Sequence, residues 1–235
     1  MSTSLLAFIT ALIAAAANVV GGIIVTSYPW GLRTLRYFIG LGSGFMLGAV
    51  FLEMFPESLE LSKNAPLWVL VGYLLLHTFE HAFASHLHFG EETHHDAMTN
   101  PVVGISALIG LLVHTFLDGV AIGTGFQVST KTGLLIFLAV LIHKVPDGFT
   151  IASITLSSGF SKRKALSATI LLGLSTIGGM LAVVISGVSP AYALPIATGG
   201  TLYVAASDLI PEVNRDPGVK LAFVVFAGVG MFLVA

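Results

Sequence analysis

Long apolar runs constrain the fold more than any other feature of this sequence. Of the 235 residues, 55% are hydrophobic and only 9% are charged, and the mean hydropathy is +0.95. A soluble globule of this size would need more polar residues to cover its surface. A helix needs about 20 apolar residues to cross a bilayer. Eight such runs predict an all-α helix bundle that forms one transmembrane domain over residues 1–235, with spans at 4–25, 37–58, 66–87, 101–124, 132–157, 165–187, 191–211 and 218–235.

The basic residues predict how these spans are oriented. Lysine and arginine accumulate in the cytoplasmic loops of membrane proteins. Only Lys63 and Lys131 fall in loops after even-numbered spans. Seven fall after odd-numbered spans: Arg33, Arg36, Lys162, Arg163, Lys164, Arg215 and Lys220. We therefore expect both termini on the non-cytoplasmic side of a plasma or inner membrane. The first apolar run continues to Val25, longer than a signal-peptide core, so we expect it to be retained as a helix.

Two of the runs carry the same ionisable motif, His-x-x-x-Asp-Gly. The first copy contains His114 and Asp118, and the second contains His143 and Asp147. Each ionisable side chain at membrane depth costs about 2.5 to 3.5 kcal/mol on insertion scales. Residues four apart share a helix face, so packing the two faces together brings two imidazoles and two carboxylates to one point. A divalent cation is the simplest partner for such a group.

The ligand set predicts which ions fit. Zn²⁺ and ions such as Fe²⁺, Mn²⁺, Co²⁺ and Cd²⁺ accept mixed nitrogen and oxygen ligands, whereas calcium and magnesium favour oxygen alone. The chain has no cysteine, which excludes disulfides and thiolate ligands, and its net charge of -2 argues against a nucleic-acid partner. The expected partners are a divalent metal ion and the lipid bilayer, and a homodimer is compatible with the sequence. The alternative is that the four polar residues only cap helices or pair with one another.

Lys144 directly follows the second motif histidine, within the run 132–157. It lies on a different helix face from His143, yet close enough to project beside the same cavity. Its ammonium could occupy the space of a second cation, which predicts one metal ion at the centre. Alternatively, Lys144 pairs with Glu53, Glu57 or another carboxylate elsewhere in the bundle.

Other ionisable residues suggest a pathway through the membrane. The pattern acid-x-x-Pro-acid occurs twice, with the carboxylates Glu53, Glu57, Asp208 and Glu212. The run 66–87 adds His77, Glu80 and His81 on one helix face. We expect these seven residues to serve as a gate or passage. The repeated motifs nest symmetrically, with three spans before and three after a central pair, which predicts inverted repeats of the kind found in secondary transporters.

The loop after residue 85 is rich in histidine. It contains His86, His88, His94 and His95, and the predicted topology places it on the cytoplasmic side. Flexible histidine-rich loops bind metals weakly, so this loop could hold an ion as it leaves. A merely solvated loop is an equal alternative.

A rival interpretation is a membrane-embedded zinc metalloenzyme. The segment His77-Thr-Phe-Glu80-His81 fits the H-x-x-E-H zinc-protease pattern, with the glutamate as general base. So short a pattern recurs easily, and it leaves the two His-x-x-x-Asp-Gly motifs unexplained. We therefore do not expect an enzyme.

Taken together, the motifs resemble the ZIP (Zrt-, Irt-like protein) family of divalent metal transporters. The resemblance covers nearly the whole chain and rests on HTFLDG, HKVPDG, EMFPE, YVAASDLIPE and the histidine-rich loop. It implies that His114, Asp118, His143 and Asp147 form the primary transport site. It also implies zinc uptake into the cytoplasm by an elevator motion, in which spans 1, 4, 5 and 6 slide past spans 2, 3, 7 and 8. The small-residue stripe Gly40, Gly44 and Gly48 and the segment ILLGLSTIGG offer smooth packing surfaces, which could slide, although static tight packing is the commoner use.

Four positions depart from the family pattern. Many members have asparagine where this chain has Thr115 and an acidic residue where it has Lys144, and both help to form a second metal site. The departures predict that this second site is missing here. Glu53 and Asp208 stand where histidine is frequent, which makes the gate chemistry harder to transfer than the central site.

Overall fold

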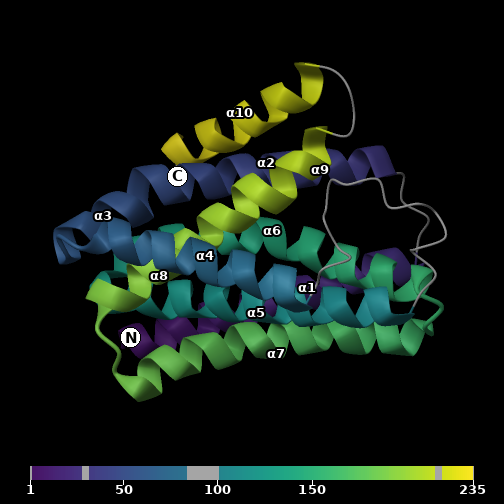
Figure 1. Ribbon diagram of the computed structural model, residues 1–235, viewed down its shortest axis with the longest axis horizontal. Helices are drawn as coiled ribbons and strands as arrows, with labels where there is room; N and C mark the ends of the chain where they lie inside the picture. The colour runs from purple at the N-terminus through teal and green to yellow at the C-terminus, as the bar shows by residue number, and fades with distance from the viewer. Residues whose placement is uncertain (1, 28–31, 84–100, 215–218, 235) are drawn as a thin grey trace.

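A computed structural model describes residues 2–27, 32–83, 101–214 and 219–234, and all regular structure in these ranges is helical (Figure 1). The first half contains α1 (Thr3–Ser27), α2 (Leu32–Ala49), the π-helix η1 (Val50–Met54), α3 (Phe55–Leu61), α4 (Ala65–Phe83) and α5 (Pro101–Val128). The second half contains α6 (Thr130–Ser157), α7 (Lys162–Ser186), α8 (Pro190–Tyr203), the π-helix η3 (Val204–Leu209), α9 (Ile210–Asn214) and α10 (Val219–Val234). The predicted all-α class is confirmed.

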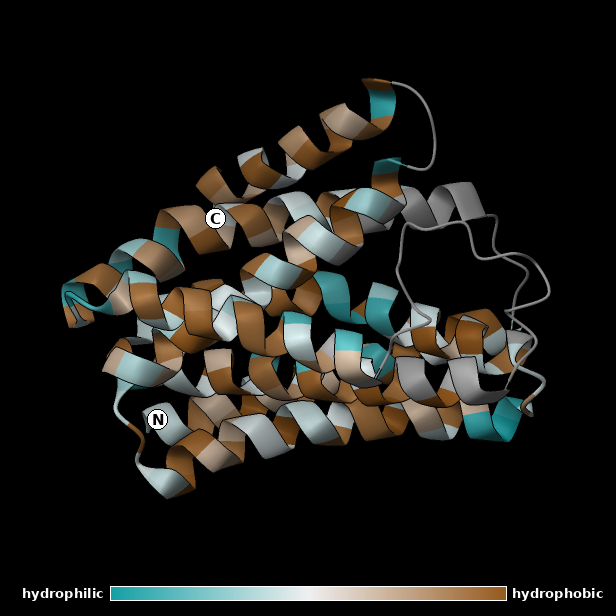
Figure 2. Ribbon diagram, in the orientation of Figure 1, coloured by the Kyte–Doolittle hydropathy of each residue, from teal (hydrophilic) through white to brown (hydrophobic). Residues whose placement is uncertain are grey.

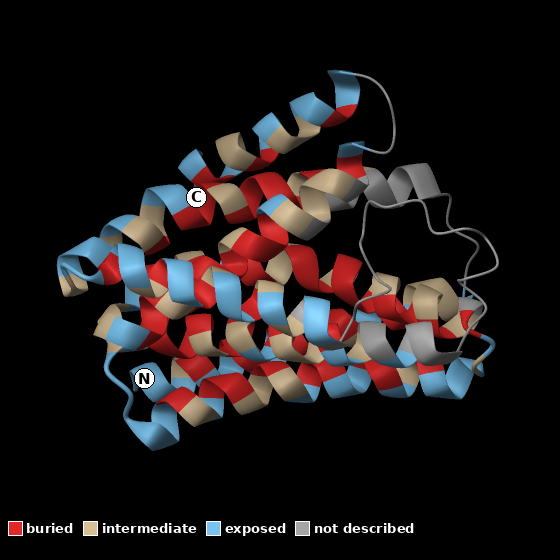
Figure 3. Cartoon of the chain, viewed as in Figure 1, coloured by how far each residue is buried: buried red, intermediate tan, exposed pale blue. Residues whose placement is uncertain are grey.

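Four stretches of helix are long and apolar enough to cross a membrane, in α1, α5, α6 and α7. Helices α4 and α10 are apolar but shorter, and the two remaining predicted spans are interrupted by a π-helix. Large apolar side chains face outward, as in Leu174 of α7, which is 57% exposed. Figures 2 and 3 show these brown, exposed faces on the outer helices. An apolar exterior of this kind is that of an integral membrane protein.

Proline explains the two π-helices. Each ends two residues before the proline of an acid-x-x-Pro-acid pattern, Pro56 in one case and Pro211 in the other. Proline lacks an N–H, so the carbonyl one turn earlier loses its usual donor. The chain widens instead: the N–H of Phe55 donates to the carbonyl of Val50, five residues back, and the N–H of Ile210 donates to Ala205.

Glycine pairs hold four helix crossings together. A Cβ added at Gly148 of α6 would overlap the carbonyl oxygen of Asn18 in α1, and one added at Gly21 of α1 would overlap the carbonyl oxygen of Val145. We call this arrangement a reciprocal glycine crossing. The pairs are Gly21 with Gly148, Gly119 with Gly179, Gly44 with Gly228, and Gly72 with Gly199. In every crossing the carbonyl belongs to the residue three before the partner glycine, so the two backbones touch directly.

These crossings make four helix pairs, which we assign to two groups. They join α1 to α6 and α5 to α7, and they join α2 to α10 and α4 to α8. In Figure 1, α10 lies along α2, at a distance from α5 and α7. The first group is α1, α5, α6 and α7, and the second is α2, α4, α8 and α10. No reciprocal crossing joins the two groups among the described residues.

Contacts between the two groups are of another kind. A Cβ at Gly42 of α2 would lie 3.5 Å from the Cβ of His143, and one at Gly200 of α8 would lie 2.8 Å from Cδ1 of Leu117. At these two positions the nearest atom belongs to a side chain, and no backbone carbonyl lies against the glycine. Of the two uses open to the stripes around Gly44 and Gly179, sliding and static tight packing, the structure shows tight packing, because both glycines lie against the backbone of a helix in their own group.

Candidate metal centre

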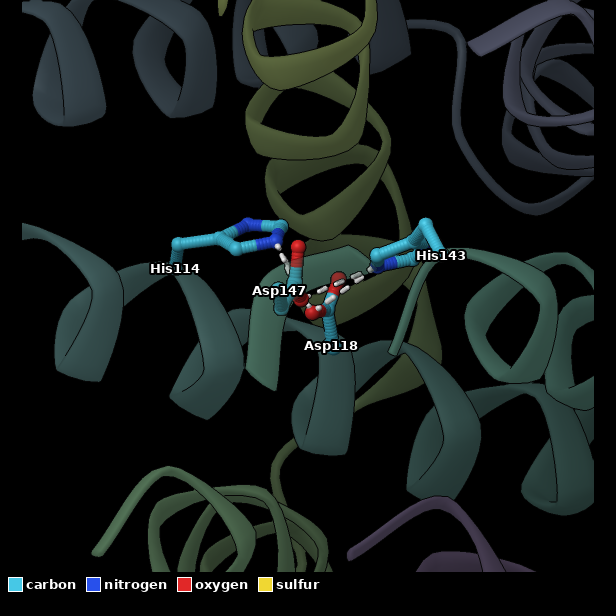
Figure 4. A group of neighbouring side chains, drawn as sticks. All are labelled: His114, Asp118, His143 and Asp147. Carbon is cyan, nitrogen blue, oxygen red and sulfur yellow. Dashed lines mark hydrogen bonds and ion pairs between the residues drawn. The ribbon is translucent and has the colours of Figure 1, made fainter. Parts of the chain in front are cut away.

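The two motif copies meet inside the bundle, where α5 packs against α6. His114 and Asp118 project from α5, and His143 and Asp147 project from α6 (Figure 4). One ligand atom from each residue lies within 4.8 Å of all the others. All four side chains are buried: His114 is 4% exposed, Asp118 and His143 are 1% exposed, and Asp147 is 6% exposed. The predicted convergence of two imidazoles and two carboxylates is therefore present.

Nitrogen and oxygen atoms alternate around the centre. Nε2 of His114 lies 3.2 Å from Oδ2 of Asp118 and 3.5 Å from Oδ2 of Asp147. Nε2 of His143 lies 3.3 Å and 3.9 Å from the same two oxygen atoms. Four atoms at these spacings need only small side-chain rotations to reach the distances of about 2.0 to 2.2 Å at which zinc binds nitrogen and oxygen.

The backbone orients one of the two imidazoles. Nδ1 of His143 lies 2.9 Å from the carbonyl oxygen of Ala139. A carbonyl only accepts, so Nδ1 carries a proton, and Nε2 faces the centre, where it is hydrogen-bonded to Oδ2 of Asp118 at 3.3 Å. A metal-ligating histidine is oriented in the same way, by a partner at its other ring nitrogen. His114 has no hydrogen bond of normal geometry at either buried nitrogen, although its Nε2 faces both carboxylates.

Lys144 completes the cluster. Its side chain is 0% exposed, and its ammonium donates to Oδ2 of Asp118 and, at 3.1 Å, to Oδ2 of Asp147. The structure places Lys144 beside the four-ligand centre, where the central carboxylates are its partners instead of Glu53 or Glu57. Thr115, on the matching position of α5, is also fully buried, and its hydroxyl donates to the carbonyl of Leu112 at 3.2 Å.

The pathway side chains that the structure describes are not among the four that converge at this centre. Glu53 sits in η1 and Glu57 in α3, and both are half-buried. His77 and His81 stack on α4 with ring centroids 4.0 Å apart, and His77 also meets the edge of Tyr203 at 5.7 Å. The backbone of Glu80, Asp208 and Glu212 lies in α4, η3 and α9, and their side chains fall outside the described part. So do the loop histidines His86, His88, His94 and His95.

Asn18 of α1 was not anticipated from the motifs. It is 0% exposed, and neither side-chain atom has a hydrogen-bond partner among the described residues. One sequence signal was available, since Asn18 is the only amide in the apolar run ITALIAAAANVVGGIIV.

Comparison with known proteins identifies the family. The family model described as "ZIP Zinc transporter" matches residues 85–235. The chain belongs to the ZIP family. Zinc transporter ZIP13 of Pongo abelii is 30% identical over 214 residues, which cover 80% of this chain and 62% of the relative. Zinc transporter ZIP4 of Homo sapiens is 40% identical over 120 residues, covering 49% of this chain and 18% of the relative.

A third relative, zinc transporter SLC39A7 of Rattus norvegicus, is 31% identical over 126 residues, which cover 49% of this chain and 27% of the relative. The chain thus spans less than two thirds of the length of each of these three proteins. All three are named as transporters, so the metalloenzyme alternative built on His77, Glu80 and His81 has no support from them. The resemblance to the ZIP family inferred from the motifs is confirmed.

Proposed function

We propose that this protein carries a divalent metal ion, zinc above all, across the membrane into the cytoplasm through the centre formed by His114, Asp118, His143 and Asp147. The observation that carries the proposal is the convergence of these four ligands at a buried point. Isolated ionisable groups at this depth are costly, whereas a bound cation compensates them. Within the described ranges, no other group of three or more metal-binding side chains comes together in this way.

The ligand chemistry and the relatives both favour zinc. Two imidazole nitrogens and two carboxylate oxygens suit a tetrahedral zinc ion, and the relatives are named zinc transporters. The same donors also accept Fe²⁺, Mn²⁺, Co²⁺ and Cd²⁺, because first-row ions are separated by availability as much as by affinity. We therefore propose zinc as the main substrate and the other ions as competitors.

We further propose that transport proceeds by an elevator motion of the two helix groups. Backbone-to-backbone glycine crossings fix the helix pairs within each group, and the packing of α1 on α7 and of α5 on α6 supports the first group as one rigid body. Between the two groups, glycines contact side chains, as Gly200 of α8 contacts Leu117 of α5. Side chains change rotamers far more readily than two touching backbones separate. The whole metal centre lies in the first body, so it would move as a unit.

An inverted repeat fits the same crossings. The repeat would relate α1 to α7, α2 to α8, α4 to α10 and α5 to α6. This exchange turns each of the four glycine crossings into another of the four. Gly148 then corresponds to Gly119, and both follow a motif aspartate. The two π-helices before Pro56 and Pro211 correspond as well. The proposal also includes eight spans with both termini outside the cytoplasm. The gate would consist of Glu53, Glu57, Asp208 and Glu212, and the ion would pass along His77, Glu80 and His81. Pairing into a homodimer remains a prediction.

We propose that one metal ion is held at a time. The ammonium of Lys144 places a buried positive charge beside both carboxylates, and this charge would repel a second ion. Thr115 turns its hydroxyl toward the carbonyl of Leu112 and away from a ligand role. A mononuclear centre follows from these two positions.

Uptake by reconstituted protein tests the function. Purified wild-type protein in liposomes should accumulate zinc, whereas Asp118→Asn and His143→Ala should lose at least nine tenths of the initial rate. Glu60→Gln is the matched control, because it makes the same kind of change at an exposed carboxylate outside the centre. Equal rates in Asp118→Asn and Glu60→Gln would refute transport through this centre.

A further inference from the structure

Asn18 has a buried amide with nothing to bind. Its side chain is 0% exposed, and both the carbonyl oxygen and the amide nitrogen lack a hydrogen-bond partner among the described residues. A buried amide without a partner is unfavourable, because it has lost its hydrogen bonds to water and gained none in return. An amide kept at such a place points to a partner that binds it in another state of the protein.

The position of Asn18 indicates which partner this is. The carbonyl of Asn18 packs on Gly148, and Gly21 packs on the carbonyl of Val145. The turn of α1 from Asn18 to Gly21 therefore lies against the turn of α6 from Val145 to Gly148, which directly follows Lys144. Lys144 and Gly148 are four residues apart, so they share one face of α6 at a separation of about 6 Å along its axis. A lysine side chain is long enough to cover that distance.

Metal binding creates a need for such a partner. The ammonium of Lys144 now donates to Oδ2 of Asp118 and Oδ2 of Asp147, and these oxygen atoms are also the ones nearest both imidazoles. A divalent ion neutralises two ionised carboxylates by itself, and it needs their lone pairs. Lys144 is 0% exposed, so its displaced ammonium has no route to water without a change in the packing around it.

We propose that the side-chain carbonyl of Asn18 accepts the ammonium of Lys144 when a metal ion takes the two carboxylates. In this exchange Nζ–H bonds to the aspartates are replaced by metal–oxygen bonds, and one Nζ–H then donates to Oδ1 of Asn18. Asn18 is thus a positioning residue for metal binding, and this role rests on the function proposed above. Two other buried hydroxyls without partners, Thr124 and Ser158, lie about 9 Å or more along the helices from the nearest centre carboxylate.

A double-mutant cycle tests the exchange. Zinc affinity is measured by calorimetry on the full chain for wild type, Asn18→Leu, Lys144→Met and the double variant. Leucine matches asparagine in size and cannot accept a hydrogen bond. We expect Asn18→Leu to weaken zinc binding at least tenfold in the wild-type background and less than twofold in the Lys144→Met background, because the coupling requires both side chains.

Thermal unfolding without metal separates this role from a structural one. Because the amide has no partner in the metal-free protein, Asn18→Leu should leave the metal-free Tm unchanged or raise it, while the shift produced by zinc becomes smaller. A lowered metal-free Tm, an unchanged zinc affinity, or an equal loss of affinity in both backgrounds would overturn the inference. Asn18→Ala, measured in the same way, replaces Asn18→Leu if that variant does not fold. Failure of the wild-type protein to bind zinc would instead refute the proposed function.

Discussion

Gly179 of α7 lies against the backbone carbonyl of Phe116 in α5, so closely that a Cβ at this position would overlap it. The preceding residue, Gly178, has no atom within 4 Å of the place where its Cβ would stand. Two adjacent glycines in one helix therefore have opposite environments. This contrast shows that position 179 requires glycine because of the crossing with α5, and not because of the conformation of α7 itself.

Alanine at these two positions should have opposite effects on stability. Gly179→Ala forces α5 and α7 apart and should lower Tm by several degrees, because overpacking costs about 1 to 3 kcal/mol. Gly178→Ala should leave Tm unchanged or raise it, since alanine is the better helix former by about 1 kcal/mol. Thermal unfolding of both variants in the same detergent measures the difference. Equal Tm values would contradict the crossing.

Removing Lys144 should change the number of bound ions. Without the buried positive charge of Lys144, a second cation is no longer repelled from Asp118 and Asp147. We expect Lys144→Ala to bind two zinc ions per chain and wild type to bind one, as counted by elemental analysis after equilibrium dialysis. Lys131→Ala, at an exposed lysine, is the control. An unchanged ratio in Lys144→Ala would remove the role assigned to this residue in excluding a second ion.

Zinc uptake should slow as the pH falls. The ligands bind metal only when deprotonated, so protons and zinc compete for the same imidazole and carboxylate atoms. Between pH 8 and pH 5 histidine ordinarily gains its proton, which removes a lone pair from the centre. Initial rates in liposomes should therefore decline on the acidic side. A flat profile across this interval would argue against ligation by His114 and His143.

Cross-links should distinguish motion between the helix groups from motion within one group. The chain has no cysteine of its own. A disulfide joining Leu117→Cys to Gly200→Cys would tie the two groups together, because a Cβ at Gly200 lies 3.8 Å from the Cβ of Leu117. A disulfide joining Gly123→Cys to Val183→Cys stays within the first group, with a corresponding separation of 3.3 Å.

Oxidation should abolish uptake in the pair between groups and spare it in the pair within one group, and reduction should restore the lost activity. Transport that survives oxidation of the Leu117→Cys, Gly200→Cys variant would exclude an elevator motion at this boundary. The two pairs also control for each other, since both place a disulfide between α5 and a neighbouring helix.

The helical class and the convergence of the four ligands could be predicted from the sequence, because both depend on local spacing. Residues four apart share a helix face wherever that helix lies, and a costly ionisable pair restricts where the face can point. His114 and His143 therefore met as expected. The position of Lys144 could be predicted from its adjacency to His143 alone.

The helix partnerships could not be predicted in the same way. Gly44 and Gly48 form a visible stripe in the sequence, but nothing in that stripe says whether its partner is α10 or a helix of the other group. That choice depends on contacts between residues far apart in the chain. The role of Asn18 could not be predicted for a similar reason, since it depends on how α1 packs against α6 and not on its neighbours in α1. The π-helices depend on how the chain relaxes around proline, which spacing does not reveal.

The reciprocal glycine crossings also bear on the lipid environment in which the protein keeps its shape. Apolar side chains are as well solvated by acyl chains as by one another, so their burial contributes little to pairing helices in a bilayer. Contact between two backbones does not depend on whether lipid or protein solvates apolar side chains better. The helix pairs should therefore survive transfer between membranes of different thickness, and adjustment to a thinner or thicker bilayer should fall on the tilt of each group as a whole.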